Sequence, residues 1–145
     1  MKIAILGAAE SGVGCKYFSQ DAVIKLAPVA GIDVPADLSL ADKLKFVQKL
    51  MEADDPRAQA IFETIGAYLA YTVVLYNQFY DLEYLMLLGR VMSGKGGDTI
   101  LRVCNEVLAA EYPELAAKCN VTLPDEKMRR VGQSVAAASL PELRK

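Results

Sequence analysis

The stretch Tyr84-Leu85-Met86-Leu87-Leu88-Gly89 decides the fold. A short, continuous apolar run that stops at a glycine is typical of a buried strand. A glycine-rich loop follows over residues 90–97, and Asp98 is placed to cap a helix from Thr99 to about Tyr112. Asn120-Val121-Thr122-Leu123 has the composition of a second strand. The order of strand, helix and strand predicts an α/β layer with parallel strands.

A further strand and further helices are expected on either side of this unit. Lys2-Ile3-Ala4-Ile5-Leu6 predicts another buried strand. Ser39 is placed to cap one helix, and Pro56 suits the first turn of a largely apolar helix that continues to about Phe79. Apolar residues at helical spacing define three more core faces. The first face lies on a helix over residues 16–26, which Pro28 ends, and comprises Phe18, Ala22, Val23 and Leu26. The second follows Ser39 and comprises Leu40, Leu44, Val47 and Leu50. The third follows a cap at Asp125 and comprises Met128, Val131, Val135 and Ala138.

The composition of the chain limits the classes of protein to which it can belong. The 145 residues, of which 53% are hydrophobic, suit a single globular domain over residues 1–145. The net charge of −2 provides no basic face for nucleic acid. The most apolar long stretch, from Ile61 to Leu75, contains Glu63 and is shorter than the roughly 20 residues that cross a bilayer. We therefore expect a soluble protein that does not enter a membrane.

The cysteines and the lack of histidine limit the metal-binding and catalytic chemistry that the chain can support. Cys15, Cys104 and Cys119 are an odd, dispersed set without a CxxC pair, which favours buried, reduced thiols in a cytoplasmic protein and no zinc site. A chain without histidine cannot contain a Ser-His-Asp or Cys-His mechanism. Asp54 and Asp55 are interpreted as the cap of the helix near Pro56, because no partner carboxylate for acid–base work accompanies them.

Two glycine-rich loops are candidate anion sites. The segment from Gly89 to Gly94-Lys95-Gly96 is one residue short of a P-loop, since Gly96 stands where a magnesium-binding hydroxyl is needed. The simpler interpretation is a tight strand-to-helix turn with Lys95 in solvent. The loop from Gly7 to Gly14, with Asp33 downstream, has the position but not the spacing of a dinucleotide-binding fingerprint. A small dinucleotide-binding domain is therefore kept as an alternative.

The order of these motifs resembles the ROK family of sugar kinases and transcriptional repressors. In that family an acidic segment leads into an apolar strand and a Gly-Gly turn, as Asp81-Leu82-Glu83 leads into Tyr84–Gly89 here. A helix like that at Ala67–Asn77 precedes the strand. Val131-Gly132 with Ala136–Ala138 resembles the closing pattern, and Gly14–Ser19 resembles the end of the family's zinc motif.

The resemblance implies a helix-rich α/β lobe of the ribonuclease-H-like, actin-like type with a small, mostly parallel sheet. In such proteins two lobes clamp ATP between them, and the carboxyl-terminal lobe supplies the turn on the adenosine side. Carried over by position, Gly89 would approach the nucleotide, with Arg90 and Ser93 nearby. ATP with magnesium is the cofactor that the resemblance implies.

The chain also departs from the family pattern. The amino-terminal Asp-x-Gly-x-Thr phosphate motif and the catalytic aspartate are absent, and Leu88 occupies the place of the first glycine in the Gly-Gly turn. We therefore expect no catalytic residue and no kinase activity from the chain alone. It is either a lobe that needs a missing amino-terminal partner or a relative without activity. A regulatory lobe that forms a homodimer through its apolar helix and tyrosines is the alternative.

Overall fold

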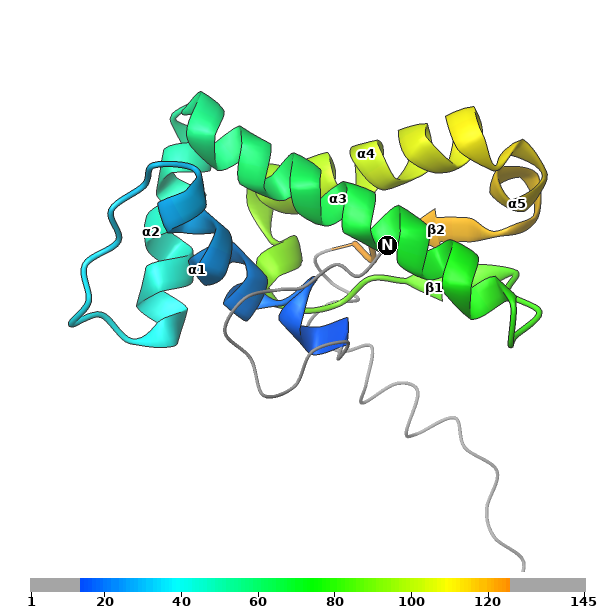
Figure 1. Cartoon of the computed structure of the whole chain (residues 1–145), viewed down its shortest axis with the longest axis horizontal. Helices are drawn as coiled ribbons and strands as arrows, with labels where there is room; N and C mark the ends of the chain where they lie inside the picture. Colours follow the sequence, from blue (N-terminus) through cyan, green and yellow to red (C-terminus); the bar gives the residue numbers. More distant parts are fainter. Residues whose placement is uncertain (1–13, 126–145) are drawn as a thin grey trace, which may run out of the picture.

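The computed structural model describes residues 14–125 and shows a helix-rich α/β fold with a small parallel sheet (Figure 1). The predicted strand over residues 2–6, the first glycine-rich loop up to residue 13 and the predicted helix after Asp125 lie outside the described residues. In chain order the elements are η1 (Gly14–Lys16), α1 (Gln20–Val29), α2 (Leu40–Glu52), α3 (Pro56–Asn77), β1 (Tyr84–Met86), η2 (Arg90–Met92), α4 (Gly94–Glu111), α5 (Pro113–Lys118) and β2 (Asn120–Thr122).

The sheet confirms the predicted parallel pairing. β1 and β2 pair with Leu85 opposite Val121, and α4 and α5 form the connection between them. β1 ends at Met86 instead of Leu88, although the Leu87 N–H still donates to the Thr122 carbonyl at 2.9 Å. Leu85, Leu87 and Val121 pack in or against the core, as a half-covered sheet requires.

The prediction that Tyr84–Leu88 is wholly buried is wrong for one face of the strand. Tyr84, Met86 and Leu88 are 76%, 57% and 54% exposed among the described residues. Side chains alternate between the two faces of a strand, so the helices that bury Leu85 and Leu87 leave the opposite face uncovered. The continuous apolar sequence concealed this asymmetry, because both faces carry apolar side chains.

The α3 helix forms the centre of the core, as predicted, but only one of its faces is buried. Asp55 caps it, with its side chain accepting from the Arg57 N–H, and Pro56 stands in the first turn. Gly66 lets α4 approach closely, because a Cβ atom there would lie 2.8 Å from the Ile100 carbonyl oxygen. The buried face comprises Ala58, Ile61, Phe62, Ile65, Gly66, Leu69, Ala70 and Val73.

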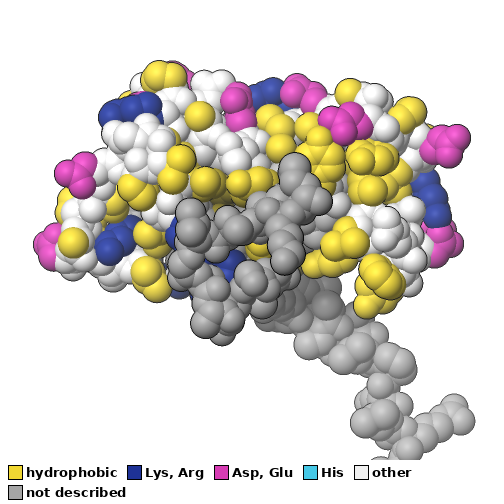
Figure 2. Space-filling model, viewed as in Figure 1, with side chains coloured by type: hydrophobic (Ala, Val, Ile, Leu, Met, Phe, Trp, Pro, Cys, Tyr) yellow, Lys and Arg dark blue, Asp and Glu magenta, His cyan; other side chains and the backbone are white. Residues whose placement is uncertain are grey.

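By length and composition alone α3 could also cross a membrane. In this fold the apolar residues of α3 have another explanation, because a helix at the centre of a core is apolar over a wide face. Tyr71, Leu75 and Tyr76, near its carboxyl end, are exposed. Figure 2 shows hydrophobic side chains mixed with acidic and basic ones along the upper edge of the molecule in this view.

The first two helices pack beside the amino end of α3 (Figure 1). Ser19 caps α1, which therefore begins at Gln20 rather than near residue 16. Pro28 lies inside the last turn instead of ending the helix before it, because the N–H groups of Ala30 and Gly31 close that turn on the Leu26 and Pro28 carbonyls. Proline here removes only one hydrogen bond.

The α2 helix begins after the predicted cap. The Ser39 hydroxyl accepts from the Asp42 N–H at 3.2 Å. Leu44 and Val47 are buried as predicted, whereas Leu40, the first residue of the helix, is exposed. The first turn of α2 therefore projects beyond the core that its later turns join.

Candidate functional site

The strongest candidate site is the turn that connects β1 to α4. Gly89 follows the strand with φ 119°, in the left-handed region that favours glycine, and its surroundings are open because a Cβ there would meet nothing within 4 Å. The buried side chains of Val91 and Met92 anchor η2 immediately afterwards. Val91 and Met92 therefore fix the turn against the core, while the backbone of Gly89 stays exposed. A ligand can approach this backbone closely.

A surface pocket of about 420 Å³ opens at this turn. It brings two of the three predicted site residues, Gly89 and Arg90, together with the amino end of α1. Its lining consists of Phe18, Ser19, Gln20, Asp21, Leu88, Gly89, Arg90 and Val91. Ser93 is not part of this lining and serves instead as the amino-terminal cap position of α4, without a side-chain hydrogen bond.

Contacts from distant helices hold the pocket in shape. The Gln48 side-chain amide of α2 donates to the Arg90 carbonyl at 2.9 Å. On the opposite wall, the Ser19 hydroxyl accepts from the Asp21 N–H, and the Asp21 carboxylate forms an ion pair with Lys16 at 2.8 Å. No local sequence pattern marks Gln48, which lies 42 residues from Arg90.

The pocket combines apolar and polar chemistry. Phe18, Leu88 and Val91 supply apolar surface, and Gln20 and Arg90 supply hydrogen-bond donors. The Arg90 side chain has no ion pair within residues 14–125, so its charge is available to an anionic ligand. This combination suits a partly apolar molecule that carries negative charge.

The resemblance of residues 89–96 to a P-loop is not matched by the structure. The amino end of α4 already holds an internal carboxylate, because Glu52 Oε1 accepts from the Lys95 N–H at 3.0 Å. Lys95 is not free in solvent either. Its ammonium group pairs with Asp54 at 2.9 Å, and that hydrogen bond raises the pKa of Lys95. No anion can occupy the same position without displacing Glu52.

The later glycines of this loop serve packing rather than phosphate binding. Gly94, Gly96 and Gly97 lie at the start of α4 or within it, so the predicted helix start at Thr99 with a cap at Asp98 is wrong. A Cβ on Gly96 would lie 2.6 Å from the Phe62 ring, and one on Gly97 would lie 2.0 Å from the Met92 carbonyl oxygen. Contact with α3 and η2 therefore requires glycine in the first turns of α4.

The remaining sequence candidates lie apart from the pocket. Asp33 is exposed in a loop after α1, and no strand adjoins it within the described part of the chain. Asp55 acts as a helix cap, as predicted, and its contact with Arg57 lowers its pKa to about 2. Cys104 and Cys119 are free and buried, as expected, and burial raises the pKa of Cys104 to about 12.

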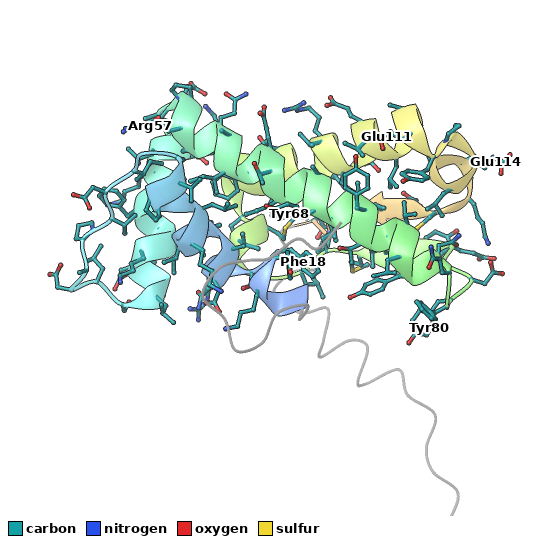
Figure 3. All side chains as sticks on the ribbon, in the orientation of Figure 1. Phe18, Arg57, Tyr68, Tyr80, Glu111 and Glu114 are labelled. Atoms are coloured by element: carbon teal, nitrogen blue, oxygen red, sulfur yellow. The ribbon has the colours of Figure 1, made fainter. Side chains whose placement is uncertain are left out.

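A second concavity lies along α3. It has a volume of about 680 Å³ and is lined mainly by aromatic and small side chains of α3 with Tyr17 and Phe18. The rings of Tyr17 and Tyr68 meet edge to face, with centroids 5.9 Å apart. Phe18 and Tyr68 lie on the same side of α3 (Figure 3). Residues 14–125 contain no group of three side chains that could hold a metal ion.

The chain matches no family model, no curated protein and no solved structure.

Proposed function

We propose that this domain is the nucleotide-side lobe of an ATP-dependent sugar kinase of ROK type. It would bind the adenosine part of ATP at the Gly89 turn and require a second lobe for catalysis. The observation that carries the proposal is the exposed backbone of Gly89 at the carboxyl end of β1, opening onto a pocket with Arg90. Ligands of open α/β sheets bind at the carboxyl ends of their parallel strands.

The contents of the pocket support a nucleotide ligand. Phe18 and Leu88 offer apolar surface for a base, and Gln20 offers polar atoms for its edge. The Arg90 guanidinium can approach a phosphate, for which arginine has the geometry and charge. The conformation of Gly89 brings bare backbone to the same opening.

Among residues 14–125, the lining of this pocket offers no free general base for a sugar hydroxyl. The carboxylate that these residues contribute, that of Asp21, is held by Lys16 and by its place in the first turn of α1. Phosphoryl transfer depends on positioning and charge stabilisation around the transferred group, which this lobe would supply only on the nucleotide side. Incubation of the chain with ATP, magnesium and a panel of sugars should therefore give no sugar phosphate.

Calorimetric titration with ATP and magnesium tests the binding proposal. We expect saturable binding by the wild-type chain and its loss in Gly89→Val. Gly31→Val is a matched control, because Gly31 also has positive φ and open surroundings but lies outside the pocket lining. Absence of wild-type binding at millimolar ATP, or equal binding by both variants, would contradict the proposal.

The alternative is a non-enzymatic ROK-like regulatory domain that acts through self-association. Exposed aromatic residues at and beyond the carboxyl end of α3, including Tyr76, Phe79 and Tyr80, favour it. A stable dimer without affinity for ATP would support this alternative over the nucleotide-binding lobe.

A further inference from the structure

A separate pocket lies at the end of the molecule where α3 and α4 meet α5. It has a volume of about 630 Å³ and shares no lining residue with the pocket at the Gly89 turn. Its walls come from the carboxyl ends of α3 and α4 and from α5. Two of its lining residues, Glu111 and Glu114, are labelled at this end of the molecule in Figure 3. The proposed nucleotide-binding function gives this pocket no role.

Two helices present their carboxyl ends to this pocket. α3 and α4 pack side by side with these ends toward α5 (Figure 1), and their last residues, Asn77 and Glu111, both line the pocket. The carbonyl groups of a last helical turn carry partial negative charge, which basic side chains usually complement. Neither helix has a basic residue in its last turn. The backbone alone therefore favours a positive charge in the pocket.

Glu111 adds a full negative charge at a position that its own helix disfavours, because a carboxylate at a carboxyl end opposes the helix dipole. The Tyr71 hydroxyl donates to this carboxylate at 2.9 Å, and the hydrogen bond raises the pKa of Tyr71. Glu111 forms no ion pair with residues 14–125. Tyr71 therefore holds in place a charge that a bound cation would compensate.

A buried acceptor in the pocket lining also lacks a donor. Asn77 Oδ1 is buried and receives no hydrogen bond from residues 14–125. Because folded proteins satisfy most buried acceptors, an unsatisfied one indicates a position for an external donor. Glu114 contributes a second exposed carboxylate to the lining. The ammonium group of Lys118 also lines the pocket, but it pairs with Asp81 and so leaves the glutamates without a counter-charge.

The rest of the lining suits a hydrocarbon chain. Val74 and Leu115 supply apolar surface, and Tyr112 adds an aromatic ring, which attracts ammonium groups as well as hydrocarbon. Residues 14–125 offer no group of three acidic or other metal-ligating side chains at this place. The lining therefore fits an organic cation with an apolar stem better than it fits a metal ion.

We propose that this pocket binds an aliphatic diamine. One ammonium group donates to the Glu111 carboxylate and to Asn77 Oδ1, and the hydrocarbon chain lies against Val74 and Leu115. The second ammonium group meets the Glu114 carboxylate. Hydrogen bonds between ionised groups are shorter and stronger than neutral ones, and they supply most of the affinity.

Calorimetric titration of the full chain with pentane-1,5-diamine tests the proposal, and pentane-1,5-diol is the uncharged control ligand. The variants are Glu111→Gln, which removes the charge, and Asn77→Leu, which removes the unsatisfied acceptor. Glu106→Gln is the matched control, because it removes the same charge from α4 at a residue outside the pocket lining. Circular dichroism and urea unfolding confirm that each variant folds.

We expect saturable binding of the diamine by wild type and by Glu106→Gln, and no binding of the diol. Glu111→Gln should weaken diamine binding about tenfold, since it removes a charge-assisted hydrogen bond. Asn77→Leu should weaken binding several-fold without lowering the free energy of unfolding, because it replaces an acceptor that lacks a donor. Absence of wild-type binding at millimolar diamine would overturn the proposal, as would equal affinities of Glu111→Gln and Glu106→Gln.

Discussion

The carboxylate of Glu52, at the end of α2, accepts a hydrogen bond from the Lys95 N–H in the first turn of α4 at 3.0 Å. A negative charge is favoured at this position, because the first N–H groups of a helix lack partners within the helix and carry partial positive charge. Glu52 therefore satisfies from within the fold a site that would otherwise attract an external anion.

Removal of this charge should weaken the fold. Glu52→Gln keeps an acceptor oxygen but loses the charge that complements the amino end of α4, so we expect the free energy of unfolding to fall by about 1 kcal/mol. Urea unfolding followed by circular dichroism measures the difference. Glu106→Gln is the control, because Glu106 only pairs with Arg102 on the exposed side of α4 and should cost no more than about 0.5 kcal/mol. Equal effects of the two changes would contradict the assigned role of Glu52.

The glycines of the β1–α4 segment should differ in their tolerance of alanine. Gly97→Ala places a Cβ 2.0 Å from the Met92 carbonyl oxygen, so we expect a loss of about 3 kcal/mol by overpacking. Gly89→Ala meets open space and should cost about 1 kcal/mol through backbone strain alone. Thermal or urea unfolding compares them. A stabilising Gly97→Ala, as helix propensity alone predicts, would show that the contact with Met92 yields easily.

The free energy of unfolding should depend on pH in the acidic range, because Asp55 ionises there. Its hydrogen bonds with Arg57 lower its pKa from 3.8 to about 2 in the folded state. The folded state thus favours the ionised form, and the resulting stabilisation is complete above about pH 4 and is lost as the pH falls toward about 2. Asp55→Asn can still cap α3 but cannot ionise. Its unfolding free energy should therefore fall less steeply than that of wild type over this pH range.

The two buried cysteines should resist thiol reagents in the folded protein. Burial raises the pKa of Cys104 to about 12 and also raises that of Cys119, so little reactive thiolate forms at neutral pH. In a Cys15→Ser background, an absorbance assay with an aromatic disulfide should register both thiols only after denaturant is added. Rapid reaction of either thiol under native conditions would show that the core opens around it.

Much of the fold could be predicted from the sequence because strands and caps depend on local patterns. The apolar run at β1, its parallel pairing with β2, the cap at Ser39 and the start of α3 at Pro56 were all predicted. The start of α4 was not, because Gly94, Gly96 and Gly97 are poor helix formers by themselves. Tertiary contacts with Phe62 and Met92 reverse that preference.

The candidate site was predicted only in part. Gly89 and Arg90 were expected at the site because of the resemblance to the ROK turn, and the structure places both at one pocket. Its other wall comes from the amino end of α1, and Gln48 reaches Arg90 from α2. These contacts join residues far apart in the chain, and no local pattern marks them.

The central claim is that a nucleotide binds at the Gly89 turn, and an NMR titration of the isotope-labelled chain tests it most directly. Addition of ATP and magnesium should shift the amide signals of Gln20, Gly89 and Arg90 in a saturable manner, with little change at Lys95, whose N–H is held by Glu52. Saturable shifts confined to Lys95 and its neighbours, or no shifts at millimolar ATP, would contradict the claim.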